Sequence, residues 1–331
     1  MAADTFAESR ALTPAPSTTL ATLDDAFHPD EIASTIRFAE QAKAENTRLA
    51  YASDWRQFER WCAGRNVLPL PCPPGLLCVY LSALADAGRR ASSIGRAAAS
   101  IAHYHHAAGN EPPNRSPAVR EVLRGIRHTL GTAPRPKAPA THDLIARMIA
   151  VCPDSLIGIR DQALLTFGFA GAFRRSELLA LEVMDMTEVA GGLRVIVRRS
   201  KTDQEGQGQE VAIPRGYRLR PVEMLQEWLA AAEISSGPVF RPVAKGGRIG
   251  DGPLGDDGFA RAIKRRAAAA GLDPAEFSGH SLRSGFLTSA AETGADALKM
   301  AEVSRHRSLD TLKGYVRRGN LFKSHAGAGF L

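Results

Sequence analysis

The sequence lacks any run of about 18 apolar residues, so it offers no candidate for a membrane-spanning helix. Its first residues also lack the basic start and apolar stretch that form a secretory signal peptide. These two absences argue against a membrane protein and against a secreted protein. We therefore expect a cytoplasmic protein with no membrane partner.

Cysteine is scarce as well, since the 331 residues include four, namely Cys62, Cys72, Cys78 and Cys152. They lie mostly among apolar neighbours, which is typical of reduced thiols in a core. Cys72 and Cys78 lack the paired spacing that a structural zinc site needs. The sequence also has no phosphate-binding glycine loop and no evident acidic metal cluster. We expect neither a metal nor a cofactor.

The composition is that of a folded globular protein, with 44% hydrophobic and 23% charged residues. A chain of 331 residues is longer than one average domain, so two hydrophobic cores are expected. The formal net charge is +7 and the sequence pI is about 9.5. This basic balance is a modest indication of a polyanionic partner such as nucleic acid.

Proline and small polar residues mark the domain boundaries. Residues 1–28 are rich in Ala, Thr, Ser and Pro, which predicts a flexible N-terminal arm. Residues 131–140 contain three prolines, which disfavour a helix and predict an extended linker. The predicted organisation is an arm (1–28), a helical domain (29–130), a linker (131–140), a mixed domain (141–319) and a C-terminal tail (320–331).

Apolar residues at helical spacing predict four helices between residues 29 and 130. We expect the third to begin at a Ser92 or Ser93 cap, and the fourth at Ser116 with Pro117 in its first turn. Three histidines, His103, His105 and His106, gather on the third helix. No carboxylate or cysteine stands at supporting spacing, so we expect surface or DNA-facing side chains and no metal site.

The fourth helix carries a basic face formed by Arg120, Arg124 and Arg127. These residues are four and seven positions apart, so their side chains stand on one side and could follow a phosphate backbone. A solvated helix face is the commoner explanation of such a pattern. The two alternatives stay open on this evidence.

The second half of the chain mixes helical and strand patterns. Residues 193–197 alternate like a strand, and a polar turn leads to a second short strand at 209–213, which predicts a hairpin. Helices are expected near 141–151, 156–170, 221–233, 257–270, 281–293, 296–304 and 308–318. The fold class is therefore mostly α with a small antiparallel β-sheet.

Residues suited to phosphate chemistry occur in a fixed order along this half. They are Arg174 in an R-x-S-E-L stretch, Lys201 at the hairpin turn, His280 and Arg283 three positions apart, and His306 and Tyr315 nine positions apart. Each has a commoner explanation by itself: an ion pair of Arg174 with Glu177, a solvated Lys201, a helix-capping His306, a half-buried Tyr315. Together they would require five independent coincidences.

In this order and spacing the sequence resembles the tyrosine recombinase, or phage integrase, family, and its S-G-H-S-x-R stretch is closest to the Cre-type branch. The resemblance covers nearly the whole chain. It implies a helical, SAM-like core-binding domain followed by a catalytic domain that acts on double-stranded DNA. Two pairs depart from the common pattern: Ala172-Phe173 precedes Arg174 where Gly-Leu or Gly-Met is frequent, and Ser304-Arg305 precedes His306 where Leu-Gly is frequent.

The resemblance implies a role for each of these residues. Arg174 and Arg283 would clamp the scissile phosphate, and Tyr315 would attack it to form a covalent 3′-phosphotyrosine link. Phenol has an unperturbed pKa of about 10, so the nucleophile needs a base. The remaining expected roles are base for His280, proton donor to the leaving 5′-oxygen for Lys201, phosphate hydrogen bonding for His306, and positioning of the other side chains for Glu177.

The family also implies that four protomers assemble on two DNA sites, with residues 320–331 exchanged between protomers. Two alternatives remain open on the sequence. One is a catalytically silent DNA-binding accessory protein of the same fold, and the other is DNA relaxation by a type IB topoisomerase. Intact Arg174, His280, Arg283 and Tyr315 argue against the first, and the helical N-terminal domain argues against the second.

Overall fold

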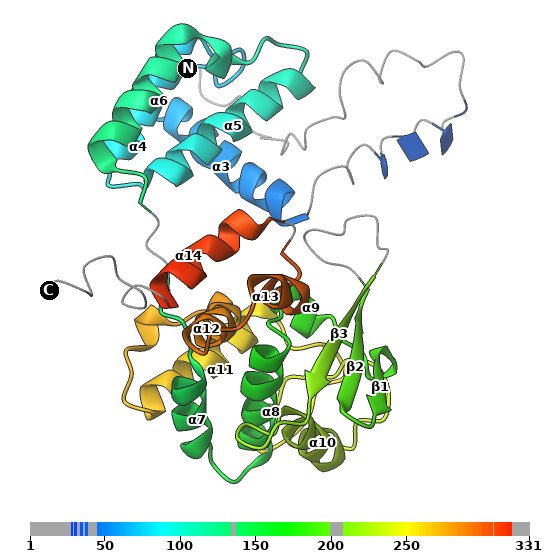
Figure 1. Ribbon diagram of the computed structural model, residues 1–331. Coiled ribbons are helices and arrows are strands. Elements are labelled where there is room, and N and C mark those ends of the chain that lie inside the picture. The colour runs from blue at the N-terminus through cyan, green and yellow to red at the C-terminus, as the bar shows by residue number, and fades with distance from the viewer. Residues whose placement is uncertain are drawn as a thin grey trace, which may run out of the picture. The chain divides into compact units, whose positions relative to one another are not determined.

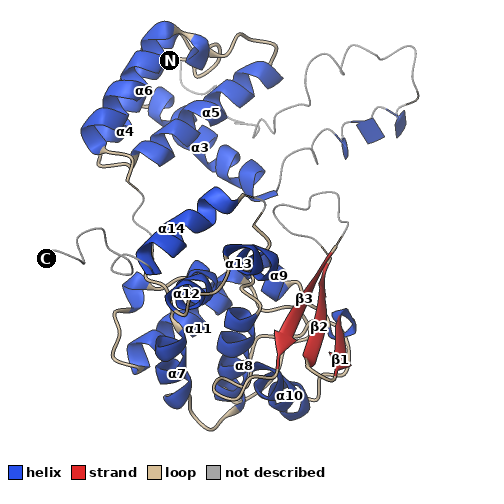
Figure 2. Ribbon diagram, viewed as in Figure 1, coloured by secondary structure: helices blue, strands red, loops and turns tan. Residues whose placement is uncertain are grey.

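The computed structural model describes residues 45–133, 137–198, 208–306 and 308–319, together with seven isolated positions between 28 and 38. The chain divides into two compact units, residues 1–134 and 135–331. Helices dominate both, and the described strands form one three-stranded antiparallel sheet (Figure 2). The predicted fold class is confirmed. In the described part of the chain, no helix has both the length and the apolar character needed to cross a membrane.

The first unit is a helical bundle around its own core. Its elements are α3 (Glu45–Ala63), α4 (Pro74–Asp86), α5 (Ala91–Ala107), a short 3₁₀ turn (Pro113–Arg115) and α6 (Pro117–Leu130). The predicted start of the fourth helix after Ser116 is confirmed. The cap at Ser92 or Ser93 is wrong, because the backbone is still extended at Arg90 and the helix begins at the buried Ala91.

Helices α3 and α5 are joined by polar and aromatic contacts in this core. The Arg96 guanidinium donates to both carboxylate oxygens of Asp54, over 2.7 and 3.1 Å.

The expectation of an exposed histidine cluster is wrong for His105, which is fully buried. Its Nε2 accepts from the Cys72 backbone N–H at 2.8 Å and its Nδ1 lies 2.7 Å from the Ile101 carbonyl oxygen, so the ring serves the packing of the core.

The sheet of the second unit comprises β1 (Met186–Val189), β2 (Gly192–Val197) and β3 (Gln209–Pro214) in that order. Val195 in the central strand pairs with Met186 on one side and Val211 on the other. The predicted hairpin is therefore confirmed. Strand β1 was not predicted, since its four residues are largely exposed and show no apolar alternation.

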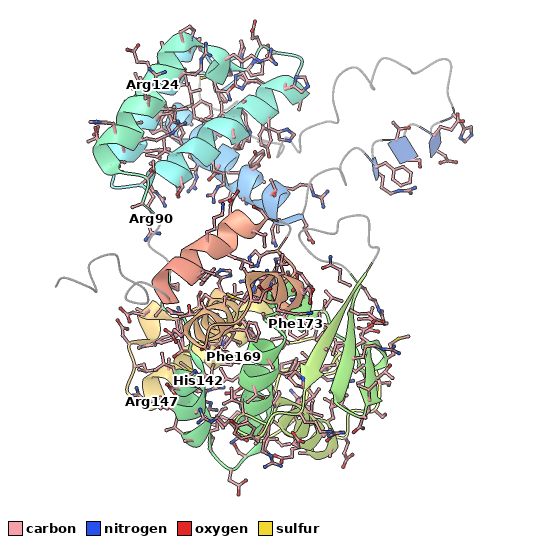
Figure 3. The ribbon with its side chains drawn as sticks, in the orientation of Figure 1. Arg90, Arg124, His142, Arg147, Phe169 and Phe173 are labelled. Atoms are coloured by element: carbon pink, nitrogen blue, oxygen red, sulfur yellow. The ribbon has the colours of Figure 1, made fainter. Side chains whose placement is uncertain are left out.

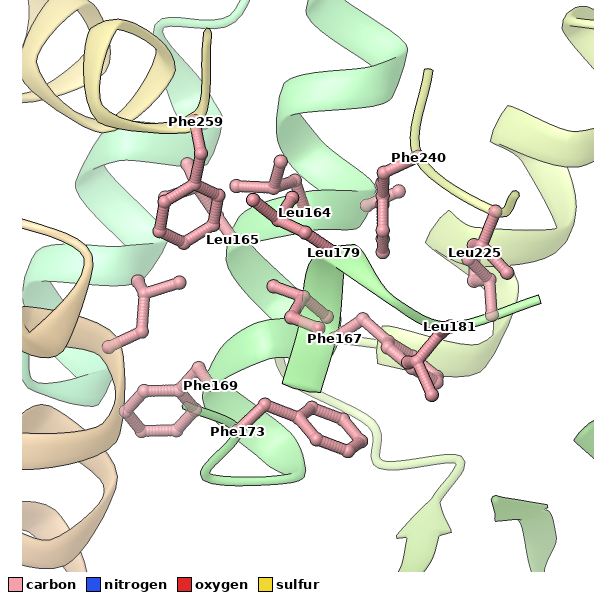
Figure 4. Packing of buried hydrophobic residues seen from close by; sticks show 14 of the residues in the cluster. Leu164, Leu165, Phe167, Phe169, Phe173, Leu179, Leu181, Leu225, Phe240 and Phe259 are labelled. Atoms are coloured by element: carbon pink, nitrogen blue, oxygen red, sulfur yellow. The ribbon is translucent and has the colours of Figure 1, made fainter. Parts of the chain in front are cut away.

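Eight helices are described in the second unit (Figure 1): α7 (His142–Ala150), α8 (Leu156–Ala170), α9 (Arg175–Leu179), α10 (Pro221–Ala231), α11 (Asp256–Ala269), α12 (His280–Glu292), α13 (Ala297–Ser304) and α14 (Leu309–Gly319). Helix α8 is buried on almost every side, and α10 and α12 pack against it. Figure 4 shows its aromatic and leucine side chains within the main core. A buried carboxylate, Asp161, is held there by three guanidiniums, those of Arg160, Arg265 and Arg266.

An extended segment runs from the predicted linker onto α12. The Ala138 N–H donates to the Glu276 carbonyl at 2.8 Å, and the Ala140 N–H donates to the Ser281 carbonyl at 2.9 Å. Gly285 makes this approach possible, because a Cβ at that position would stand 1.8 Å from the Ala140 carbonyl oxygen. The helix that carries His280 and Arg283 is thus fixed to the start of the second unit.

We expect Gly285→Ala to destabilise the second unit by about 1–3 kcal/mol, because neither the helix nor the extended backbone can give way. Gly314→Ala in α14 is the matched control, since a Cβ there meets no atom within 4 Å. Alanine favours a helix interior by up to about 1 kcal/mol, so the control should be neutral or stabilising. Urea unfolding followed by circular dichroism measures both, and equal stability of the two variants would contradict the close approach.

Candidate active site

Arg174 stands at the turn between α8 and α9 and forms the N-cap of α9. Its backbone N–H donates to Glu177 Oε2 at 2.9 Å, and its Nη1 donates to Glu177 Oε1 at 2.5 Å. The Glu177 side chain is fully buried, so its carboxylate orients Arg174 through both backbone and guanidinium. The neighbouring Arg175 points elsewhere and pairs with Asp256 at 2.6 Å. The R-x-S-E-L spacing assigns Arg174, and not Arg175, as the site residue, and it is Arg174 that pairs with Glu177.

Arg283 enters the same region from the first turns of α12. It is 1% exposed, and its Nη1 donates to the Ala172 carbonyl at 2.7 Å. Its Nη2 lies 3.3 Å from His306 Nδ1 and 3.4 Å from Nε2. His280 begins the same helix one turn earlier and is exposed, with its backbone N–H 3.3 Å from Ser278 Oγ.

His306 follows the end of α13, where Arg305 is the C-cap residue. Its Nδ1 lies 2.7 Å from Ser304 Oγ, and the Ser304 hydroxyl donates to the Met300 carbonyl at 2.5 Å. With its only proton used there, the hydroxyl accepts from Nδ1–H, which leaves Nε2 as the acceptor nitrogen of the neutral ring. Donation from Nε2 to a phosphate requires the other tautomer or a protonated ring.

Arg305 completes the group of guanidiniums. Its Nη2 donates to Glu177 Oε2 at 2.7 Å, so the one carboxylate serves both Arg174 and Arg305. Neither Arg305 nor Ser304 was predicted as a site residue. The sequence did mark both residues, because Ser304-Arg305 precedes His306 where Leu-Gly is frequent in the family. We call Arg174, Arg283, Arg305 and Glu177 the arginine cluster.

Tyr315 lies on α14, which packs against α12 and α13 (Figure 1). The ring is half-buried against the small core formed by Leu287, Ala291, Met300 and Leu312. The structure thus pairs Arg174 with Glu177 and Arg283 with His306 through direct contacts, and Arg305 links the two pairs through Glu177 and the Ala172 carbonyl. The helix of Tyr315 packs onto α12 and α13.

The remaining predicted site residues fall into two groups. Lys201 and the tail 320–331 are outside the described residues. Arg120, Arg124 and Arg127 are exposed on α6 in the first unit, where Figure 3 labels Arg124. Among the described side chains, no three of His, Cys, Asp or Glu gather as they would around a metal ion.

Residues 140–320, more than half of the chain, match the model of the phage integrase family. An integrase/recombinase XerD homolog of Selenomonas ruminantium is 38% identical over 296 residues, covering 88% of this chain and 86% of that protein. The chain belongs to the phage integrase family. Tyrosine recombinase XerD of Xanthomonas axonopodis pv. citri is 29% identical over 87% of this chain and 93% of its own length.

Solved recombinase structures share the fold of this integrase. The XerH site-specific recombinase in its post-cleavage complex aligns with a TM-score of 0.64 at 17% identity, covering 91% of this chain and 83% of that chain. A lambda integrase dimer bound to a core site aligns with a TM-score of 0.53 at 17% identity, covering 84% and 91%. The chain is a tyrosine-type site-specific recombinase, and this function fits better than the accessory or topoisomerase alternatives.

The arginine cluster of this recombinase carries an excess of positive charge. Burial and the like charges of Arg174 and Arg305 lower the pKa of Arg283 to about 9. Since this pKa is still above 7, Arg283 remains protonated at pH 7. Burial by itself would raise the pKa of Glu177, but the positive Arg305 and the hydrogen bonds and charge of Arg174 lower it overall. Three guanidiniums against one carboxylate leave two positive charges, which suits a phosphate group.

The two histidines of the candidate site are held in the neutral form. Partial desolvation and the charges of Arg283 and Arg174 lower the pKa of His280. Burial, Arg283, Arg174, His280 and Arg305 lower the pKa of His306 to about 4. Neutral imidazole has a free lone pair, so His280 can accept a proton at pH 7.

We predict that His306 makes the protein less stable as the pH falls from about 6.5 to about 4. Within that window the unfolded chain binds a proton at His306 while the folded chain does not, so acid favours unfolding. His306→Gln should remove about 1–2 kcal/mol of this loss at pH 5, after allowance for solvent screening. Urea unfolding of both proteins at several pH values measures the difference, and parallel pH profiles would refute it.

Proposed function

We propose that this recombinase cleaves and rejoins double-stranded DNA through a covalent 3′-phosphotyrosine link to Tyr315. The observation that supports this most is that Arg174 donates to the Arg305 carbonyl while Arg283 lies 3.3 Å from the next residue, His306. These contacts bring together residues from three elements that are far apart in the sequence. The helix of Tyr315 packs on two of these elements. Such a cluster has the charge and the donors that a scissile phosphate needs.

Arg174 and Arg283 hold the two non-bridging oxygens of the phosphate in this proposal. The phosphodiester carries one negative charge, and its pentavalent transition state carries about one more. The excess of two positive charges in the arginine cluster matches the transition state better than the ground state, and differential binding of this kind lowers the barrier. Glu177 keeps Arg174 in place from the buried side.

The chemical steps follow from the groups around this phosphate. The Tyr315 oxygen attacks phosphorus while its proton passes to His280, and the bond from phosphorus to the 5′-oxygen breaks. Lys201 donates a proton to that leaving oxygen, as an alkoxide leaves poorly. His306 supports the phosphate through the tautomer that carries a proton on Nε2. Rejoining is the reverse, with the 5′-hydroxyl attacking the phosphotyrosine, so neither ATP nor a metal is required.

The wider assembly is part of the same proposal. Residues 29–130 form a core-binding domain and residues 141–319 the catalytic domain, and both contact DNA in the cytoplasm. Four protomers join two sites, with the tail 320–331 exchanged between protomers. The related XerH and Tn1549 integrase structures are complexes with DNA substrates, which supports DNA as the partner.

We predict that Tyr315→Phe abolishes covalent attachment to DNA, since the attacking oxygen is removed. The probe is a library of nicked duplexes of random sequence, from which adducts are isolated under denaturing conditions and sequenced. Tyr217→Phe is the matched control, because Tyr217 is an exposed tyrosine of the same unit. The wild type and the control should form adducts with or without a chelator. Adducts formed by Tyr315→Phe would disprove the role of Tyr315.

We further predict that replacing Arg120, Arg124 and Arg127 with Gln weakens DNA binding at every sequence. Log affinity falls as log salt rises, and the loss of three phosphate contacts should make this negative slope shallower by about 3. The matched control replaces three exposed basic residues in loops of the second unit, Arg218, Lys245 and Arg248. Fluorescence anisotropy from about 50 to 200 mM salt measures both, and equal slopes would favour a merely solvated helix face.

A further inference from the structure

Arg305 occupies a backbone conformation that an arginine rarely adopts. Its φ and ψ are 56° and 44°, in the left-handed region, where it caps α13. For a residue with a Cβ this conformation is strained by roughly 1–2 kcal/mol, and glycine is the usual residue at such helix ends. The side chain must therefore make contacts that offset the strain.

Those contacts lie under the site. The Arg305 side chain is 2% exposed, and its guanidinium stands 5.1 Å from the centre of the Phe173 ring. Figure 4 shows Phe173 just beyond the end of α8, where it is part of the main core. The guanidinium donates to the carbonyl oxygens of Gly171 at 3.0 Å and Ala172 at 3.2 Å, and to Glu177 Oε2 at 2.7 Å. One side chain thus ties the end of α13 to the turn that presents Arg174.

The charges around Glu177 give this tie a chemical consequence. Each oxygen of this carboxylate accepts from a different guanidinium, Oε1 from Arg174 and Oε2 from Arg305, and Oε2 also accepts from the Arg174 backbone N–H. If Arg305 were neutral, Glu177 would neutralise Arg174 alone, and the arginine cluster would keep one positive charge instead of two. Arg305 therefore leaves Arg174 free to act on an anion.

We propose that Arg305 is a positioning residue of the recombination site. Its guanidinium binds the Glu177 carboxylate, so that Glu177 orients Arg174 without cancelling the charge of Arg174. The backbone carbonyl of Arg305 also lies 3.3 Å from Arg174 Nη2, which links the same residue to the guanidinium directly. His306 is the next residue, so Arg305 fixes its place as well. This inference rests on the proposed function, because it assigns Arg174 to the phosphate.

The test uses the full-length protein and a nicked duplex obtained from the adduct selection described above. Arg305→Gln, which removes the charge but keeps hydrogen bonding, should slow single-turnover cleavage by about 10–100-fold, as loss of a supporting partner commonly does. Its affinity for the duplex should stay within about 3-fold of wild type, because DNA affinity is dominated by phosphate contacts outside the cleavage site. Arg305→Lys should recover at least part of the rate.

A double variant separates charge balance from simple structural support. In Arg305→Gln the carboxylate of Glu177 opposes Arg174 unshared, so adding Glu177→Gln restores two net positive charges. The double variant should therefore cleave faster than Arg305→Gln. A merely structural role predicts that the second change slows the reaction further or leaves it unchanged.

Arg266→Gln is the matched control, since it removes another buried guanidinium from a buried carboxylate, Asp161, in the same unit. It should lower the melting temperature and leave the cleavage rate, measured below that temperature, near wild type. A wild-type rate for Arg305→Gln, or a double variant no faster than it, would overturn the inference. If wild-type protein yields no adduct at all, it is the proposed function that fails.

Discussion

The buried carboxylate of Glu177 is the interaction on which the arrangement of this site depends. It accepts from the backbone and guanidinium of Arg174 and from the guanidinium of Arg305. Removing one partner from such a buried group typically costs about 3–5 kcal/mol, because an unpaired charge remains in the interior. The three bonds therefore fix α9 and the end of α13 relative to one another, and with them Arg174 and His306.

The turn at the end of α8 also holds the arginine side chains in place, through its backbone carbonyl groups. The last carbonyl groups of a helix and the turn that follows lack partners within the helix, and they attract positive charge. Here the Ala172 carbonyl accepts from both Arg283 and Arg305, and the Gly171 carbonyl accepts from Arg305. A turn in the main chain thus gathers guanidiniums that would otherwise repel one another. This explains how three like charges persist in a largely buried site.

Such an arrangement is prepared for an anion before any anion binds. The excess positive charge is held by backbone carbonyls and one carboxylate, and both histidines are kept neutral by desolvation and by the surrounding charges. Preorganised charge is more effective than charge that must reorient during a reaction. The membership of the chain in the phage integrase family agrees with the proposed role of the arginine cluster, since a recombinase must stabilise the same phosphate during both cleavage and rejoining.

The sequence alone predicted the longer helices and the hairpin, because hydrophobic periodicity and turn residues act locally, but it did not predict the short helix α9 or strand β1. It also identified Arg174, His280, Arg283, His306 and Tyr315 as candidate site residues, since the reaction requires these residue types and they occur in the order typical of the family. Only the tertiary structure decided that His105 is a core residue and that Arg305 shares Glu177 with Arg174. Those contacts join residues that are 33 and 128 positions apart, and no local pattern reports which distant atoms will share a buried hydrogen bond.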